Sequence, residues 1–175
     1  GLFTWGDTSY SSYLNTLDVV ETCAQYLQDH LGKTRPVFGG NKINSVDKDQ
    51  RLKQAAALAP LLRGLCSSER HMIGHFTDDE RVLEFVNSYD LDTLAPLGTS
   101  CPDHFLRTKI SPLVLSLGAE EVLNDSAAVI QKLKPAFEEY KNLYRSYYDT
   151  CKHPNSPAMR DPNPVVILYP GIGMF

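Results

Sequence analysis

Short apolar runs alternate with longer segments of helical periodicity along most of this chain. The runs Pro112–Leu117 (PLVLSL) and Val165–Tyr169 (VVILY) are nearly continuous in apolar residues, which is typical of strands buried on both faces of a parallel sheet. Further strands are predicted at Arg70–Phe76 and Met174–Phe175. Because helical segments separate these runs, we expect an α/β fold in which helices flank a mostly parallel sheet, as in an α/β/α sandwich.

Three longer helices are predicted where apolar residues recur at three- and four-residue steps. They cover Tyr10–His30, Asp47–Cys66 and about Ala127–Thr150. Pro60 and Pro135 lie inside the second and third of these segments. A proline ring and its missing N–H should kink the second helix at Pro60 or divide it in two, and should bend the third helix at Pro135.

The stretch Lys33–Val46 contains a proline, a Gly-Gly pair and no hydrophobic period, so it is predicted to be a linker. Residues 1–32 then form an N-terminal appendage, made of a short strand at Leu2–Trp5 and the first helix. Residues 47–175 form the α/β domain, and its last strand is cut short at Phe175.

Charged and nucleophilic side chains concentrate in Gly98–Lys109 (GTSCPDHFLRTK), a loop without helical or strand periodicity. Loops that carry such groups are often functional. Guanidinium and ammonium groups suit a phosphate or a carboxylate. The candidate anion-binding residues of the loop are Arg107, Lys109, His104 and Cys101. His104 and Asp103 are the candidates for proton transfer. The alternative is a structural turn in which Asp103 pairs with Arg107 or Lys109.

Composition and spacing argue against several kinds of site. A net charge of −4 gives no electrostatic footprint for nucleic acid, and no apolar run is long enough to span a membrane. The four cysteines form no CxxC pair, which favours reduced thiols in a cytoplasmic protein. The five histidines fall on separate segments without HxH spacing, so no metal site is predicted in this chain. The closing PGIGMF lacks the third glycine and the helix of a dinucleotide fingerprint.

Four stretches carry a resemblance to a known family: GLFTWGDT, VLEFVNS, GTSCPDHFLRTK and VVILYPGIGMF. Together they resemble the middle of large bifunctional bacterial proteins that join a class II aldolase to a short-chain dehydrogenase. These proteins are usually named rhamnulose-1-phosphate aldolase/alcohol (lactaldehyde) dehydrogenases. The resemblance implies that residues 1–32 are the C-terminal strand-helix remnant of the aldolase part, and that a metal-binding histidine of that part lies just before Gly1. It also implies that the zinc and NAD of the parent bind outside this segment.

A short sequence similarity between GLF at the start and GMF at the end suggests that residues 47–175 are a degenerate aldolase-like repeat. Three functions remain open. The chain is a non-catalytic structural or inter-domain segment, which orders the remaining aldolase and dehydrogenase parts or a homo-oligomer. Alternatively, its loop contributes to a sugar-phosphate site, or the chain is a free-standing module that binds a small anion or a sugar phosphate. The parent is expected to be an aldehyde-lyase and an NAD-dependent oxidoreductase, and this chain alone is expected to have neither activity.

Overall fold

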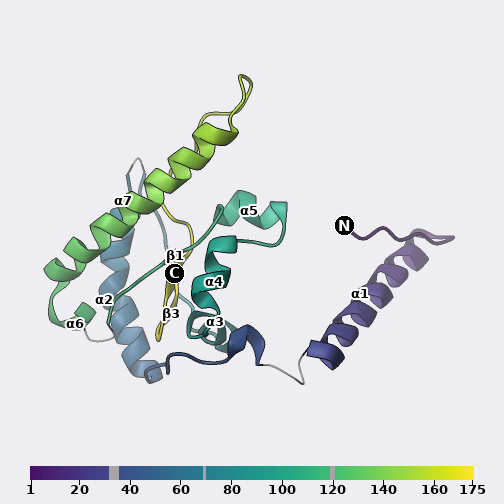
Figure 1. Ribbon diagram of the computed structural model, residues 1–175, viewed down its shortest axis with the longest axis horizontal. Coiled ribbons are helices and arrows are strands. Elements are labelled where there is room, and N and C mark those ends of the chain that lie inside the picture. The colour runs from purple at the N-terminus through teal and green to yellow at the C-terminus, as the bar shows by residue number, and fades with distance from the viewer. Residues whose placement is uncertain (32–35, 69, 119–120) are drawn as a thin grey trace. The chain divides into compact units, whose positions relative to one another are not determined.

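The computed structural model describes residues 1–31, 36–68, 70–118 and 121–175 (Figure 1). The chain divides into two compact units, Gly1–Gly40 and Asn41–Phe175. The boundary falls inside the predicted linker, residues 33–46, of which residues 33–35 lie outside the described part of the chain. Each unit is treated by itself below.

The first unit contains one long helix, α1 (Ser9–Leu31), and a short 3₁₀ turn, Val37–Gly39. The predicted strand at Leu2–Trp5 is wrong, because this segment is extended without a strand partner. Side chains hold it to the helix instead: the Thr4 hydroxyl donates to the Ser12 carbonyl at 3.1 Å, and Asn15 donates to the Trp5 carbonyl at 2.8 Å. No residue of α1 is buried, so its apolar stripe is exposed.

A small sheet lies at the centre of the second unit (Figure 1). Its strands are β1 (Leu113–Val114), β2 (Ile167–Tyr169) and β3 (Gly173–Met174), in that order. β1 and β2 are parallel, with Leu113 opposite Ile167, whereas β2 and β3 are antiparallel. The α/β organisation therefore holds, but the sheet is small and mixed rather than the predicted mostly parallel sandwich.

The predicted strand at Arg70–Phe76 is also wrong. Most of this segment faces solvent, and Ile73 is 96% exposed. The following residue, Thr77, forms an isolated bridge to Met174 of the sheet. The approach is close: a Cβ on Gly173 would lie 2.5 Å from the Thr77 carbonyl oxygen, which explains why glycine occupies that position.

The helices of the second unit begin at recognisable caps. Asp47 caps α2 by accepting from the Gln50 N–H at 3.0 Å, and Asp125 caps α7 by accepting from two N–H groups. Pro60 and Pro135 lie inside these two helices, as predicted. The helices are α2 (Lys48–Cys66), α3 (Glu80–Val86), α4 (Leu91–Leu94), α5 (Pro102–Thr108), α6 (Glu121–Asn124) and α7 (Ser126–Cys151), with a 3₁₀ turn at Ala95–Leu97. None of the described helices is both long and apolar enough to cross a membrane.

Successive side chains of β2 point into two hydrophobic clusters, because neighbouring residues of a strand face opposite sides of a sheet. Ile167 and Tyr169 belong to the larger cluster, which α2 and α7 complete. Leu168 belongs to the smaller cluster with Val86 and Leu91 from α3 and α4. Helices thus cover both faces of the sheet, and β2 is the element on which both cores depend.

Asn87 ties the end of α3 to the turn between β2 and β3. Its buried side chain accepts from the Gly171 N–H at 2.6 Å and donates to Ser45 Oγ at 2.7 Å. Its carbonyl accepts from the N–H groups of Lys42 and Ile43. These bonds satisfy polar groups that burial would otherwise leave unpaired.

Candidate anion-binding cleft

The loop singled out in the sequence contains a short helix, α5, between two residues of unusual backbone geometry. Gly98 has a φ of 72°, and a Cβ there would lie 1.8 Å from the Ile110 carbonyl oxygen, so only glycine fits. Pro102 occupies the first turn of α5, where its missing N–H costs no hydrogen bond. Lys109 ends the helix with φ 67° and ψ −173°, a backbone conformation that residues other than glycine rarely adopt.

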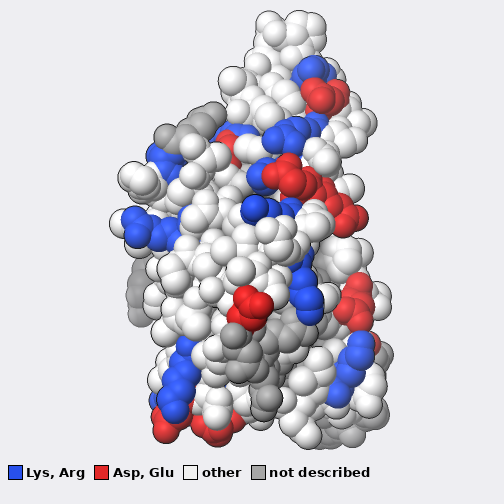
Figure 2. All heavy atoms as spheres, turned by 90° about the vertical axis from the view of Figure 1, so that its left-hand side faces the viewer, with Lys and Arg blue, Asp and Glu red and all other residues white. Residues whose placement is uncertain are grey.

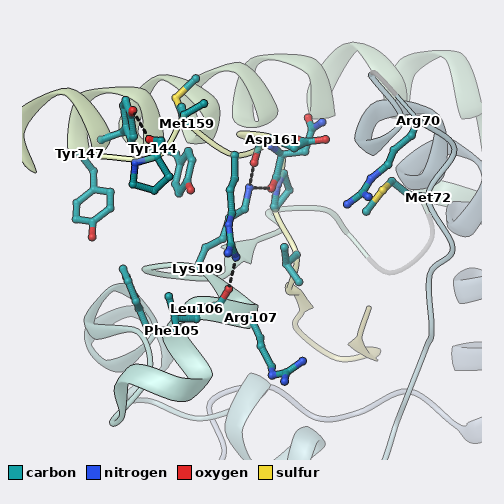
Figure 3. A pocket seen from close by; sticks show the side chains of 17 residues that line it. Arg70, Met72, Phe105, Leu106, Arg107, Lys109, Tyr144, Tyr147, Met159 and Asp161 are labelled. Atoms are coloured by element: carbon teal, nitrogen blue, oxygen red, sulfur yellow. Dashed lines mark hydrogen bonds between the residues drawn. The ribbon is translucent and has the colours of Figure 1, made fainter. Parts of the chain in front are cut away.

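A cleft of about 760 Å³ opens beside this loop, within the second unit (Figure 3). Its walls come from α5, from the second half of α7 and from the proline-rich segment 157–165. Figure 3 shows Tyr144 and Tyr147 on the α7 side, Phe105 on the α5 side, and Lys109 and Asp161 between the two walls. The volume lies within the range typical of small-molecule sites, about 300–1,000 Å³.

Lys109 is held by the wall of the cleft rather than free in it. Its Nζ donates to the carbonyl oxygens of Asp161 and Asn163 and lies 4.4 Å from the centroid of the Tyr144 ring. Burial lowers the pKa of Lys109, and the nearby Asp161 carboxylate opposes that shift. These contacts fix the strained backbone of Lys109 and join α5 to the segment after α7.

Asn163 lies almost fully buried behind this clamp. Its amide donates to the Cys66 carbonyl at 3.2 Å and to Ser68 Oγ at 2.9 Å, while its backbone N–H donates to Asp161 Oδ1 at 2.7 Å. Burial raises the pKa of the Cys66 thiol to about 11, so this thiol stays protonated at neutral pH and is a poor nucleophile. These hydrogen bonds hold the segment around Asn163 to the end of α2.

Arg160 crosses from the proline-rich segment to α5. Its Nη1 donates to the Leu106 carbonyl oxygen at 3.1 Å. Burial raises the pKa of Tyr144, and the positive charge of Arg160 opposes that rise only in part. The phenol of Tyr144 consequently stays neutral beside the guanidinium at neutral pH.

The structure brings together only part of the predicted set. Arg107 and Lys109 line the cleft, although the guanidinium of Arg107 points away from Lys109 in Figure 3. Cys101, Asp103 and His104 are not among its lining residues. His104 and Asp103 are exposed, and the hydrogen bond at His104 involves its carbonyl, which accepts from Thr108. Both side chains face solvent outside the cleft.

Two cationic residues of the cleft, Arg70 and Arg160, were missed by sequence reasoning. They are separated from Gly98–Lys109 by 28 and 51 residues along the chain, so only the tertiary fold brings them near it. Arg70 lies in the segment that was predicted to be a strand, and Arg160 lies in a proline-rich loop without periodicity. No local signal in the sequence links them to the loop.

The described residues do not fit the zinc and NAD that the resemblance implies for the parent. No three histidine, cysteine, aspartate or glutamate side chains of the described ranges lie together as a metal site. The PGIG stretch forms the turn between antiparallel β2 and β3, whereas a dinucleotide fingerprint needs a turn from a strand into a helix.

The cleft also lies at an unexpected edge of the sheet. Lys109 and residues 163–165 precede β1 and β2, so the cleft is at the amino ends of these parallel strands. Open α/β sheets usually bind ligands at the carboxyl ends. The cleft therefore lies at the edge opposite to the usual one.

The sequence is similar to that of one known family and of one curated relative. Residues 53–175 match the family model described as "Aldolase class II, second domain". Over 174 residues the chain is 34% identical to "Uncharacterized oxidoreductase YuxG" of Bacillus subtilis (strain 168), an alignment that covers 99% of this chain. The chain spans about a quarter of the length of that curated relative, with 25% of it aligned. No solved structure matches the chain.

Proposed function

The chain belongs to the family of class II aldolase second domains, and on that premise we propose that it is a segment of a bifunctional sugar-phosphate aldolase/short-chain dehydrogenase. The parent would be of the rhamnulose-1-phosphate aldolase/alcohol (lactaldehyde) dehydrogenase kind, a cytoplasmic bacterial protein of rhamnose metabolism. Two findings support this: the family match, and a longer relative whose printed name is that of an oxidoreductase.

Within that parent, the segment is structural rather than catalytic. The dispersed histidines and the hairpin formed by PGIG support this, because the described residues supply neither a metal-ligand set nor a dinucleotide turn. Zinc and NAD would bind the remaining aldolase and dehydrogenase parts, with which this segment packs. The exposed apolar stripe of α1 is suited to such packing, or to contact with a second copy in a homo-oligomer.

The segment also offers an anion-binding surface at its α5 cleft. The observation that carries this is the charge of the lining, which contains four cationic side chains and one carboxylate, Asp161. A phosphate or a carboxylate would lower the mutual repulsion of these cations. A free-standing module for a small anion or a sugar phosphate is the alternative function, and the same charge pattern favours it.

Activity measurements on the purified chain test the structural role. We expect no cleavage of rhamnulose 1-phosphate with added zinc, no NAD reduction with lactaldehyde, and no stoichiometric zinc by elemental analysis. Turnover together with stoichiometric zinc would move the active site into this segment.

A titration with inorganic phosphate tests the anion-binding surface separately. We expect weak saturable binding that falls when Arg107 is replaced in Arg107→Gln. The absence of any anion binding would remove the surface from the proposal.

A further inference from the structure

Arg160 is the best-placed cation of the cleft to receive a ligand. One of its nitrogen atoms, Nη1, is held by the Leu106 carbonyl at 3.1 Å, which fixes the guanidinium across the opening. A guanidinium carries five N–H donors, so most of those of Arg160 remain for a ligand. Its planar fork matches a phosphate with two parallel hydrogen bonds.

Arg160, Arg70 and Arg107 have no carboxylate partner among the described residues, unlike basic groups elsewhere in the unit. Arg51, for example, pairs with Asp78 at 3.0 Å. On the face presented in Figure 2, acidic and basic side chains are interspersed. Lys141 likewise pairs with Glu138 at 2.6 Å. The whole chain carries a net charge of −4, so the excess of positive charge in the cleft is local. This local positive charge favours the binding of an anion.

Aromatic rings line the cleft on both the α5 and the α7 walls. Phe105 on α5 meets Tyr147 on α7 edge to face, with ring centroids 6.0 Å apart and planes at 79°. Tyr144 lies 6.2 Å from Tyr147, at 41°. In the described part of the chain the hydroxyls of these two tyrosines have no hydrogen-bond partner, whereas Tyr148 donates to the Pro157 carbonyl at 2.7 Å. Such rings favour a flat, apolar partner in edge or offset contact.

A bare phosphate would fill only part of the cleft. A volume of about 760 Å³ is far larger than one phosphate requires, and a lone anion would leave the aromatic walls uncovered. The charge and the walls together require an acid group and a flat body in one ligand.

We propose that this cleft binds a phosphate monoester with a flat aromatic body, with its phosphate on Arg160 and its ring against Phe105 and Tyr147. The inference rests on the anion-binding surface proposed above and specifies its ligand. Arg70 and Arg107, which also line the cleft, add long-range attraction for the phosphate.

Calorimetric titration of the full 175-residue chain at low salt tests the ligand class. The probes are phenyl phosphate, cyclohexyl phosphate of similar size, and inorganic phosphate. We expect phenyl phosphate to bind at least tenfold more tightly than inorganic phosphate and several-fold more tightly than cyclohexyl phosphate. Equal affinity for the three probes would overturn the aromatic ligand while leaving the anion-binding surface standing, and no binding of any probe would overturn both.

Two charge-matched variants locate the site. Arg160→Gln should weaken binding of phenyl phosphate by about tenfold or more, because a charge-assisted bidentate contact is lost. Arg81→Gln removes the same charge from an exposed position of α3 and should change the affinity less than twofold. Equal effects of the two variants would show a non-specific charge effect and refute the site.

An NMR titration of the ¹⁵N-labelled wild-type chain tests the position of the site without a variant, and it therefore still applies if Arg160→Gln does not fold. Phenyl phosphate should shift the amide signals of residues 105–109, 144–148 and 158–161 and leave those of α3 unchanged. Shifts confined to other residues would place the ligand elsewhere and refute the proposal.

Discussion

Lys109→Met removes the ammonium that clamps α5 to the segment after α7, while the length of the side chain is kept. The wild-type Nζ donates to the carbonyl oxygens of Asp161 and Asn163 and lies over the ring of Tyr144. In the variant, the half-buried carbonyl oxygens of Asp161 and Asn163 lose their charged hydrogen-bond donor. The folded state should therefore lose stability, whereas the hydrophobic clusters around β2 stay unchanged.

The size of this loss follows from the contacts. Each of the two hydrogen bonds from the charged Nζ contributes about 1.5–3 kcal/mol, and the cation–π contact about 0.5–1 kcal/mol. Solvent screening at this half-buried side chain and the entropy of ordering it remove roughly half of the sum. We expect Lys109→Met to lower the free energy of unfolding by about 2–3 kcal/mol.

A second variant at the same position separates the clamp from the backbone strain. Lys109→Gly also loses the ammonium, but glycine adopts φ 67° and ψ −173° without the cost of about 1–3 kcal/mol that other residues bear. Lys109→Gly should consequently be more stable than Lys109→Met by about 1–2 kcal/mol. The reverse order would show that the backbone at this position is not strained.

Urea denaturation at pH 7, followed by circular dichroism, measures both effects through the unfolding midpoint. Lys152→Met is the control, because it breaks an exposed ion pair with Asp149, 2.7 Å long, and should leave the midpoint unchanged. A Lys109→Met midpoint equal to that of the wild type would refute the clamp as a stabilising contact.

Three further outcomes are expected. Phe137 is 1% exposed in the larger cluster, and Phe137→Ala leaves a cavity there. Urea denaturation should show a free energy of unfolding lower by about 3–5 kcal/mol. A loss below about 1 kcal/mol would contradict the tight packing of this cluster. Burial raises the pKa of Cys66 to about 11 and that of Tyr140 to about 12, so the unfolded chain releases these protons first and stability should fall as pH rises above about 9. Cys66→Ser should lessen that fall between about pH 9 and 11, and an unchanged pH profile would show that the thiol does not contribute to it. A chain that begins at Asn41 should unfold at the same urea midpoint as the full chain, since α1 contributes no buried residue; a lower midpoint would show that the two units stabilise each other.

The long helices could be predicted from the sequence because their signals are local. The apolar period and the Asp47 cap place α2 within one residue of its observed start, and the stripe of α7 is equally clear. The helix α5 carried a weaker signal, a proline at its first position, in a stretch that otherwise reads as a loop.

The strands were harder to predict, because strand pairing depends on residues far apart in the chain. Arg70–Phe76 has the composition of a strand, but it pairs with no strand of the described residues, and Ile73 faces solvent. Conversely, the two-residue strand β3 is fixed by a hairpin with β2 and by the bridge from Thr77.

The cleft shows the same division between local and tertiary information. The sequence draws attention to Arg107 and Lys109, which do line the cleft. It does not reveal that the ammonium of Lys109 is bound to backbone carbonyls, nor that Arg160 reaches across to α5. Both facts depend on how the segment after α7 folds back, which no periodicity encodes.

The position of β2 near the end of this chain has a consequence for synthesis on the ribosome. α2 begins at Lys48, but the strand that completes its core starts only at Ile167. At about 5–20 residues per second, translation takes on the order of 10 s to cover that interval. During this time the apolar faces of α2 and α7 have no sheet to cover them. The nascent chain is therefore a natural client for chaperones that bind exposed apolar segments, and it is most prone to aggregate before β2 emerges.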